Sequence, residues 1–121
     1  MLTIYGLSHC TTTKKAKKYL EEKNLKIDDI IDIRENPPSD IIIKAAINQA
    51  DGNARKIMNT SGSLYRELGL KDKLDSMNES DIVELLKNNG MLIKRPLITD
   101  GDTITTGARE TKLNQVWLEN H

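Results

Sequence analysis

The fold of this 121-residue chain is decided by the stretch SHCTTTKK, residues 8–15, which contains its only cysteine, Cys10. A short, partly β-branched apolar run, LTIY at residues 2–5, comes before it and is typical of a strand. In residues 11–24, apolar side chains recur at i, i+3 and i+4 among lysines and glutamates, which predicts an amphipathic helix. The sequence therefore places its single thiol where a strand is followed by a helix.

A thiol at the start of a helix is expected to be reactive. The N–H groups of the first helical turn lack helical partners, and the helix dipole adds partial positive charge there. Both effects stabilise a thiolate, so we expect the pKa of Cys10 to lie below its ordinary value. Lys14 adds a positive charge one turn on, and hydroxyl groups come from Thr11, Thr12 and Thr13. The alternative is a buried cysteine that packs as a small hydrophobic residue, but its polar neighbours favour the reactive thiol.

The rest of the chain predicts a second strand, a helical block, a hairpin and a final helix. Residues 25–33 are β-branched, and a helix connects them to the first strand, so these two strands should be parallel. Two alternating runs flank Asp100-Gly101 within residues 95–107, which predicts an antiparallel hairpin with a type I′ turn. The expected helices cover residues 40–50 after a Ser39 cap, 53–57, 62–68, a segment from an Asn78 cap to about Gly90, and a last segment with Leu113, Val116 and Trp117.

Strand–helix–strand followed by hairpin–helix is the plan of a thioredoxin-like α/β domain. We expect one domain over residues 1–121, with a mixed four-stranded sheet and a helical insertion at residues 39–89. The balance of 18 basic and 18 acidic residues argues against non-specific binding to nucleic acid. Neither a membrane span nor a signal peptide is evident in the sequence. A single cysteine cannot form a disulfide within the chain. We therefore expect a cytoplasmic protein. Nothing in the sequence has the spacing of a zinc site, and we expect no bound metal.

The chain resembles the ArsC/Spx family, which includes arsenate reductases and the Spx and MgsR regulators. Four stretches carry the resemblance in family order, namely IYGLSHCTTTKKAKKYL, NTSGSLYRELGL, MLIKRPLI and TGARE. The family has a thioredoxin-like fold with a helical insertion, and its reactive cysteine at the start of the first helix corresponds here to Cys10. Many relatives have Cys-x-x-Cys at this point. Here Thr13 replaces the second cysteine, so a dithiol switch within the chain is impossible.

The resemblance also implies which residues surround the thiol. Arg95 matches the oxyanion-holding arginine of the Arg-Pro motif, and Pro96 matches the cis-proline beside the reactive cysteine. Arg109 matches a later family arginine, although an ordinary residue at a helix start is an equal alternative. Asn59 stands where arsenate reductases have a third arginine, and a local turn is its alternative role. An uncharged asparagine cannot make the charged contact of that arginine, and each such contact contributes roughly 1.5–3 kcal/mol to binding. We therefore expect arsenate to be a poor substrate.

Two functions follow from these residues. In the first, Cys10 is the nucleophile of a thiol oxidoreductase that acts on a small oxyanion or on a mixed disulfide of glutathione or another small thiol. No bound cofactor is expected, and a small thiol or a glutaredoxin would regenerate the enzyme because the chain has no resolving cysteine. In the second, the chain is an Spx-like regulator that binds the RNA polymerase α subunit near Gly52. We expect a monomer.

Overall fold

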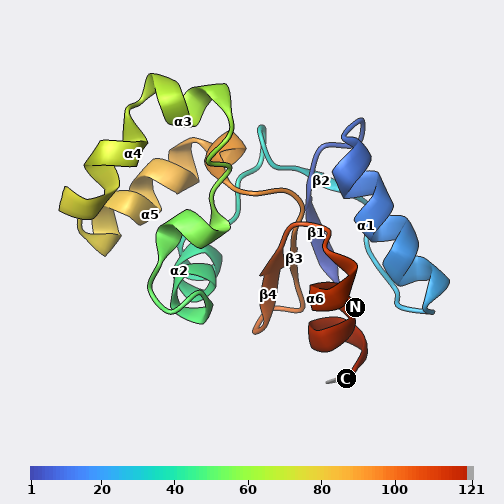
Figure 1. Cartoon of the computed structure of the whole chain (residues 1–121). Coiled ribbons are helices and arrows are strands. Elements are labelled where there is room, and N and C mark those ends of the chain that lie inside the picture. The colour runs from blue at the N-terminus through green and yellow to red at the C-terminus, as the bar shows by residue number, and fades with distance from the viewer. Residues whose placement is uncertain (120–121) are drawn as a thin grey trace.

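The structure, a computed structural model, describes residues 1–119 and is built on a mixed four-stranded sheet with the order β2-β1-β3-β4 (Figure 1). The strands are β1 (Thr3–Gly6), β2 (Ile31–Asp32), β3 (Leu97–Thr99) and β4 (Ile104–Thr106). β1 is parallel to β2 and antiparallel to β3, which is antiparallel to β4. The predicted thioredoxin-like α/β fold is therefore confirmed.

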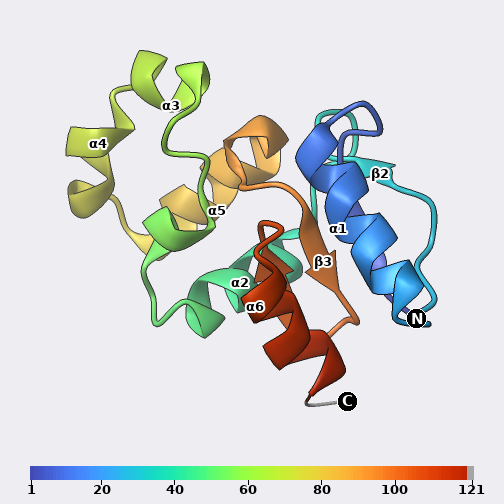
Figure 2. The ribbon, with the colours of Figure 1, turned by 45° about the vertical axis from the view of Figure 1, so that its right-hand side comes forward.

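Helices cover both faces of this sheet. Figure 2 shows α1 (Thr11–Glu22) and α6 (Glu110–Leu113) on the near side of the sheet and α2 on its far side. The helix α6 continues directly into a π-helical turn, η4 (Asn114–Leu118). Between β2 and β3, Met58 and Ile93 form an isolated antiparallel bridge. The helices of this segment are α2 (Asp40–Gln49), η1 (Ala54–Ile57), α3 (Ser63–Glu67), α4 (Leu70–Lys73), η2 (Leu74–Ser76), α5 (Glu79–Asn88) and η3 (Gly90–Leu92).

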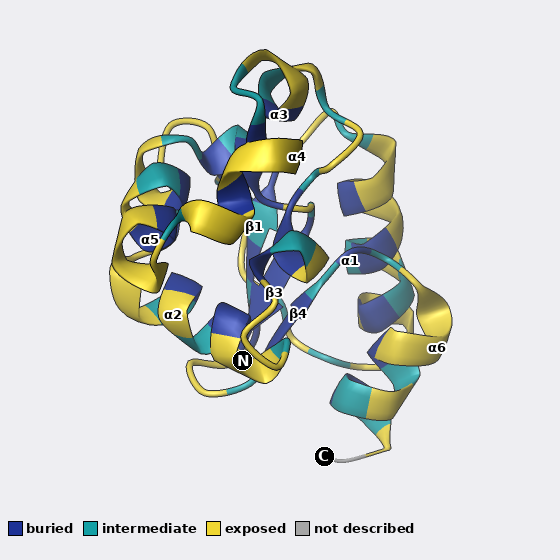
Figure 3. Ribbon diagram, turned by 60° about the vertical axis from the view of Figure 1, so that its left-hand side comes forward, coloured by how far each residue is buried: buried dark blue, intermediate teal, exposed yellow. Residues whose placement is uncertain are grey.

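The alternation of side chains along β3 divides the core into two clusters. Leu97 packs on the side of α2 and α5, in one cluster with Ile43 and Leu86. Ile98 packs on the opposite side, where Leu20 of α1 and Trp117 of η4 complete a second cluster. Figure 3 shows β3 and most of β4 as buried and the outward helix surfaces as exposed. Burying each large apolar side chain contributes ~1.5–3 kcal/mol to the free energy of folding. This burial holds both helix layers to the sheet.

The second strand is much shorter than predicted. Of residues 25–33, only Ile31–Asp32 forms a ladder with β1, and Ile27 makes an isolated parallel bridge to Leu2. Leu2 and Tyr5 are three residues apart on β1, whereas their partners Ile27 and Ile31 are four residues apart. The extra residue on the edge strand interrupts the ladder, as a bulge does, so the predicted strand of residues 25–33 was wrong in its extent.

The hairpin is confirmed, but its turn differs from the predicted type. Thr99 pairs with Ile104, so the turn is centred one residue later than Asp100-Gly101. Only Gly101 has a positive φ, of 108°, whereas a type I′ turn requires two such residues. The Asp100 carboxylate accepts from the N–H groups of Asp102 and Thr103 at 2.9 and 2.8 Å, and this local bonding replaces the I′ geometry.

Two of the helices begin at the side-chain caps that the sequence predicts. The Ser39 hydroxyl accepts from the Ile42 N–H at 3.4 Å, and Asn78 Oδ1 accepts from the Asp81 N–H at 2.8 Å. Each cap satisfies a backbone donor that has no partner within its helix. The cap at Asn78 has the shorter hydrogen bond and is the better one to test.

We expect Asn78→Ala to lower the free energy of unfolding by about 1 kcal/mol, because the capping acceptor is lost. The matched variant Asn78→Ser keeps an acceptor oxygen and should lose much less. Urea denaturation followed by circular dichroism measures both. Equal stabilities for the alanine and serine variants would contradict a capping role.

Candidate active site

Cys10 is the N-cap residue of α1, as the sequence predicts. Its backbone is extended, with φ −80° and ψ 123°, and its carbonyl accepts the first helical hydrogen bond from the Lys14 N–H at 3.0 Å. Its own N–H donates to the Leu7 carbonyl at 2.9 Å, which closes a tight turn after β1. The thiol is partly exposed. The end of β1 and the start of α1 therefore hold Cys10 in a partly buried position, packed against the core cluster of Leu97.

The surroundings of Cys10 stabilise its thiolate form. Burial by itself raises the pKa of Cys10, but hydrogen bonds from the Thr13 N–H, the Thr13 hydroxyl and the Thr12 N–H outweigh it. The positive charge of Arg95 lowers the pKa further, so the pKa lies below its ordinary value. As a thiol, Cys10 makes no side-chain capping bond. The donors act on the thiolate, which is a much stronger acceptor than a thiol.

The three threonines after Cys10 have different roles. Thr13 is fully buried, and its hydroxyl oxygen also accepts from the Leu7 N–H at 3.4 Å. A Cβ on Gly6 would lie 2.6 Å from that oxygen, so the glycine allows Thr13 to pack against β1. Thr11 and Thr12 are exposed, and Thr12 acts through its backbone N–H. Thr13 therefore ties the thiol to the end of β1.

Arg95 supplies the positive charge near the thiol. The Arg95–Pro96 peptide bond is cis. One terminal nitrogen of the guanidinium donates to the Met91 carbonyl at 3.1 Å and lies 3.7 Å from the Met91 sulfur. Arg95 Nε is buried and has no hydrogen-bond partner within residues 1–119. Lys14 is exposed on the first turn of α1. The guanidinium is thus held by one neighbour and keeps donor capacity for an anion.

Asn59 and Arg109 lie together in one pocket. Both line a pocket of about 580 Å³, and neither Cys10 nor Arg95 is among its lining residues. The Asn59 side chain is used locally, because Oδ1 accepts from the Ser61 hydroxyl at 3.4 Å. A Cβ on Gly62 would lie 2.6 Å from its amide nitrogen, so the side chain folds back over its own turn. This geometry favours the local-turn alternative for Asn59.

The same pocket contains two cations that the sequence analysis did not select, Lys94 and Lys112. Lys94 directly precedes Arg95 in the stretch MLIKRPLI, and Lys112 follows the stretch TGARE. Adjacency to two recognisable motifs was the only signal in the sequence. The pocket that brings Lys94, Lys112 and Arg109 together is formed by segments more than ten residues apart, so it is a product of the fold.

Within residues 1–119, no helix is long and apolar enough to cross a membrane. In the same part of the chain, no group of three or more histidine, cysteine, aspartate or glutamate side chains is arranged to hold a metal ion.

Comparison with known proteins extends over nearly the whole chain. The model of the ArsC family matches residues 5–116. The uncharacterised protein YusI of Bacillus subtilis (strain 168) is 47% identical over 116 residues, which cover 96% of this chain and 98% of YusI. The global transcriptional regulator Spx of Enterococcus faecalis is 25% identical over 115 residues, which cover 95% of this chain and 85% of Spx.

A solved structure agrees with these sequence relatives. A possible arsenate reductase from Streptococcus mutans UA159 matches with a TM-score of 0.81 and 40% identity, covering 90% of this chain and 92% of that one. The relatives therefore include a possible arsenate reductase and a transcriptional regulator.

Proposed function

The chain belongs to the ArsC family, and from that premise we propose that it is a thiol oxidoreductase that works with one cysteine. In the first step, the Cys10 thiolate attacks one sulfur of a small disulfide R–S–S–R′, forming Cys10–S–S–R and releasing R′–S⁻. In the second step, the thiolate R″–S⁻ of a small thiol attacks the sulfur of R, which releases the Cys10 thiolate and R–S–S–R″. Each step forms one S–S bond and breaks one, so the electrons balance.

The observation that carries this proposal is the stabilisation of the Cys10 thiolate. The thiolate is the nucleophilic form, and a lowered pKa increases its fraction near neutral pH. The donors from Thr12 and Thr13 and the charge of Arg95 all lower the pKa of Cys10. Cys10 is also only partly buried, which is compatible with access by a small disulfide. No second cysteine is present, so the external thiol must complete the cycle.

Arsenate is the less favoured substrate in this proposal. Of the three expected anion-holding positions, only Arg95 acts on the thiol, whereas Arg109 lines a separate pocket. Asn59 carries no charge, and its amide is used within its own turn. Because Arg95 is the one of these three positions that acts on Cys10, we expect a dianion such as arsenate to bind weakly there.

The test is the pH dependence of Cys10 alkylation by iodoacetamide, a neutral reagent. We expect Arg95→Met to raise the pKa of Cys10 toward its ordinary value, because a positive charge that favours the thiolate is removed. The rate curve should move to higher pH and the rate at neutral pH should fall, by a modest amount because Arg95 is the smallest of the causes that lower the pKa of Cys10. Arg95→Lys keeps the charge and should restore most of the rate.

The matched control is Lys14→Met, which removes the same charge from an exposed position on α1. It should change the curve less than Arg95→Met does. A wild-type curve centred at the ordinary thiol pKa would contradict the proposed activation of Cys10. An Arg95→Met curve that coincides with the wild-type curve would exclude Arg95 as one of its causes.

The second candidate function is regulation of transcription through contact with the RNA polymerase α subunit. It is favoured by the Spx relative, which aligns with 95% of this chain. Gly52, the expected contact position, is exposed just after α2, and a Cβ added there would meet no atom within 4 Å. Co-purification of the α subunit with the tagged protein, lost in Gly52→Arg, would support this function. Disulfide exchange by the isolated protein would support the enzyme instead.

A further inference from the structure

We propose that the outer edge of β4 binds a short acidic peptide of a partner protein, which joins the sheet as a fifth strand. Two pockets of about 580 and 210 Å³ lie along this edge, between β4 and η1. Lys56, Thr106 and Lys112 line both of them, and we call the two together the β4 slot. The inference adds an interaction surface to the molecule and does not involve Cys10.

The backbone of β4 has groups that point away from the sheet. β4 is the last strand on its side of the sheet, with β3 as its neighbour (Figure 1). At the end of the hairpin, the Gly107 N–H donates to the Pro96 carbonyl at 3.0 Å, so residue 107 faces β3. The direction alternates along an antiparallel ladder. Thr105 therefore also faces β3, whereas Ile104 and Thr106 direct their backbone groups outward.

Gln49 already pairs with one end of this edge. Its Oε1 accepts from the Ile104 N–H at 2.9 Å, and its Nε2 donates to the Asp102 carbonyl at 2.7 Å. The side-chain amide thus bonds to β4 as the backbone of another strand would. Within residues 1–119, the next two outward groups, the Ile104 carbonyl and the Thr106 N–H, have no hydrogen-bond partner. One residue of an added strand can satisfy both, by donating its N–H and accepting with its carbonyl.

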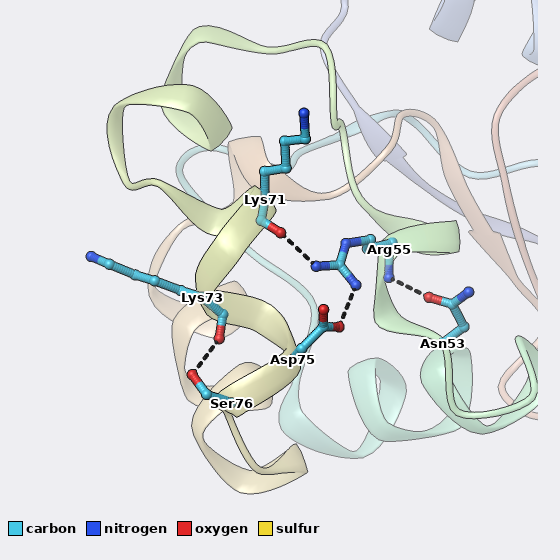
Figure 4. A network of polar contacts seen from close by, with 6 residues as sticks. All are labelled: Asn53, Arg55, Lys71, Lys73, Asp75 and Ser76. Carbon is cyan, nitrogen blue, oxygen red and sulfur yellow. Dashed lines mark hydrogen bonds and ion pairs between the residues drawn. The ribbon is translucent and has the colours of Figure 1, made fainter.

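The larger pocket of the β4 slot is basic. Among the described residues, five cationic side chains line it, and no aspartate or glutamate does. Figure 4 shows one of them, the Arg55 guanidinium, held between the Asp75 carboxylate and the Lys71 carbonyl, both at 2.8 Å. A second, Lys56, lies 4.0 Å from the Asp51 carboxylate. The uncompensated charge therefore comes from the other three cations.

These three cations are Lys94, Arg109 and Lys112. Their side chains make no ion pair or hydrogen bond within residues 1–119. Lys94 lies over Gly107, where an added Cβ would be 3.2 Å from its Cε, so the glycine leaves room for the lysine stem. A cleft lined by one sign of charge attracts groups of the opposite sign. The charge of the larger pocket is therefore complementary to a peptide that carries carboxylates.

The smaller pocket has a more apolar lining. Ala46, Ala50 and Ile57 contribute to it, and its carboxylate, Asp51, is the one that lies near Lys56. Successive side chains of an extended peptide point to opposite sides, and side chains on one side are about 6.6 Å apart. A peptide in which acidic and apolar residues alternate can therefore present carboxylates to the cations and apolar side chains to the smaller pocket.

Backbone pairing favours a peptide over a nucleic acid as the occupant. The free carbonyl of Ile104 requires a donor that repeats along the partner, and a peptide supplies one in its N–H groups. A phosphate backbone offers acceptors alone. The chain also has equal numbers of basic and acidic residues, so it lacks the surplus of cations that non-specific nucleic-acid binding uses.

The test is a titration of the isotope-labelled protein with the blocked peptide acetyl-Glu-Val-Glu-Val-Glu-amide, followed by amide NMR. We expect saturable shifts at Ile104, Thr106 and Gly107. In Lys94→Gln/Lys112→Gln the affinity should fall about fivefold or more, because two charged contacts are removed. The control, Lys15→Gln/Lys18→Gln, removes two exposed charges from α1 and should bind like wild type.

N-methylated peptides test the strand pairing without any change to the protein. Alternate residues of an added strand direct their N–H groups toward β4. Methylation of the glutamate nitrogens in one peptide, and of the valine nitrogens in another, keeps the charge of both. One of the two peptides should lose at least about tenfold in affinity, and the other should bind nearly as well as the parent.

Three results would overturn the proposal. Equal binding of both methylated peptides would exclude pairing with the edge of β4. Equal binding of acetyl-Lys-Val-Lys-Val-Lys-amide would exclude the role of the cations. Single-stranded oligothymidylate that competes as well as the acidic peptide would assign the β4 slot to phosphate chains. Absence of shifts at Ile104 and Thr106 with the acidic peptide at millimolar concentration would also contradict it.

Discussion

Cys10→Ser is expected to abolish disulfide exchange, with a fall in rate of at least about 1,000-fold. A serine hydroxyl does not ionise near neutral pH and forms no S–S bond, and the chain has no other cysteine to replace the thiol. The measurement is reduction of hydroxyethyl disulfide by the purified protein with excess glutathione, corrected for the uncatalysed reaction. Since serine is close in size to cysteine and position 10 is partly exposed, the fold should be retained.

The neighbouring variant Ser8→Ala is the matched control, because Ser8 is exposed and adds no charge near the thiol. It should keep the wild-type rate. Residual exchange in Cys10→Ser at more than a small fraction of that rate would show that a contaminant or another group performs the reaction. Either outcome decides whether Cys10 is the nucleophile.

Wild type and Cys10→Ser also test the thiolate through the pH dependence of their free energies of unfolding. The fold lowers the pKa of Cys10, so its stabilising contribution is present above the pKa of the unfolded thiol and is lost as pH falls through the folded pKa. The free energy of unfolding of wild type, minus that of Cys10→Ser, should therefore increase as pH rises between these two values. A difference that stays constant with pH would contradict a stabilised thiolate.

Gly90→Ala is expected to lower the free energy of unfolding by about 3 kcal/mol or more, the largest effect of a single methyl group in this chain. A Cβ at Gly90 would lie 1.9 Å from the Ile33 carbonyl oxygen and 3.0 Å from its carbonyl carbon. Ile33 is fully buried, and its N–H donates to the Gly6 carbonyl at 3.0 Å, so it cannot easily move. Urea denaturation at neutral pH measures the loss.

The control for Gly90→Ala is Gly52→Ala. Gly52 has a positive φ of 78°, but an added Cβ would meet no atom within 4 Å. Its substitution should cost about 1 kcal/mol, from backbone conformation alone. If both variants lose the same stability, the close approach of η3 to the end of β2 is not what requires glycine at position 90.

Much of the fold could be predicted because its signals are local. The apolar spacing in α1 and the caps at Ser39 and Asn78 depend on residues within one or two helical turns. The hairpin was also evident from alternation, but its turn was not, because Asp100 bonds to the backbone of its own loop. The length of β2 could not be predicted, since its register depends on how an edge strand meets β1.

The sequence by itself determined the position of the thiol at a strand–helix junction, the absence of a resolving cysteine and the family resemblance. These are properties of neighbouring residues and of residue counts. Only the tertiary structure distinguished the buried Thr13 from the exposed Thr11, and showed that the charge of Arg95 lowers the pKa of Cys10 while Arg109 lines a pocket. It also brought Lys94 and Lys112 into one pocket. The physical reason is that burial and charge act through space, and distances between distant segments are set only when the sheet and its two helix layers pack.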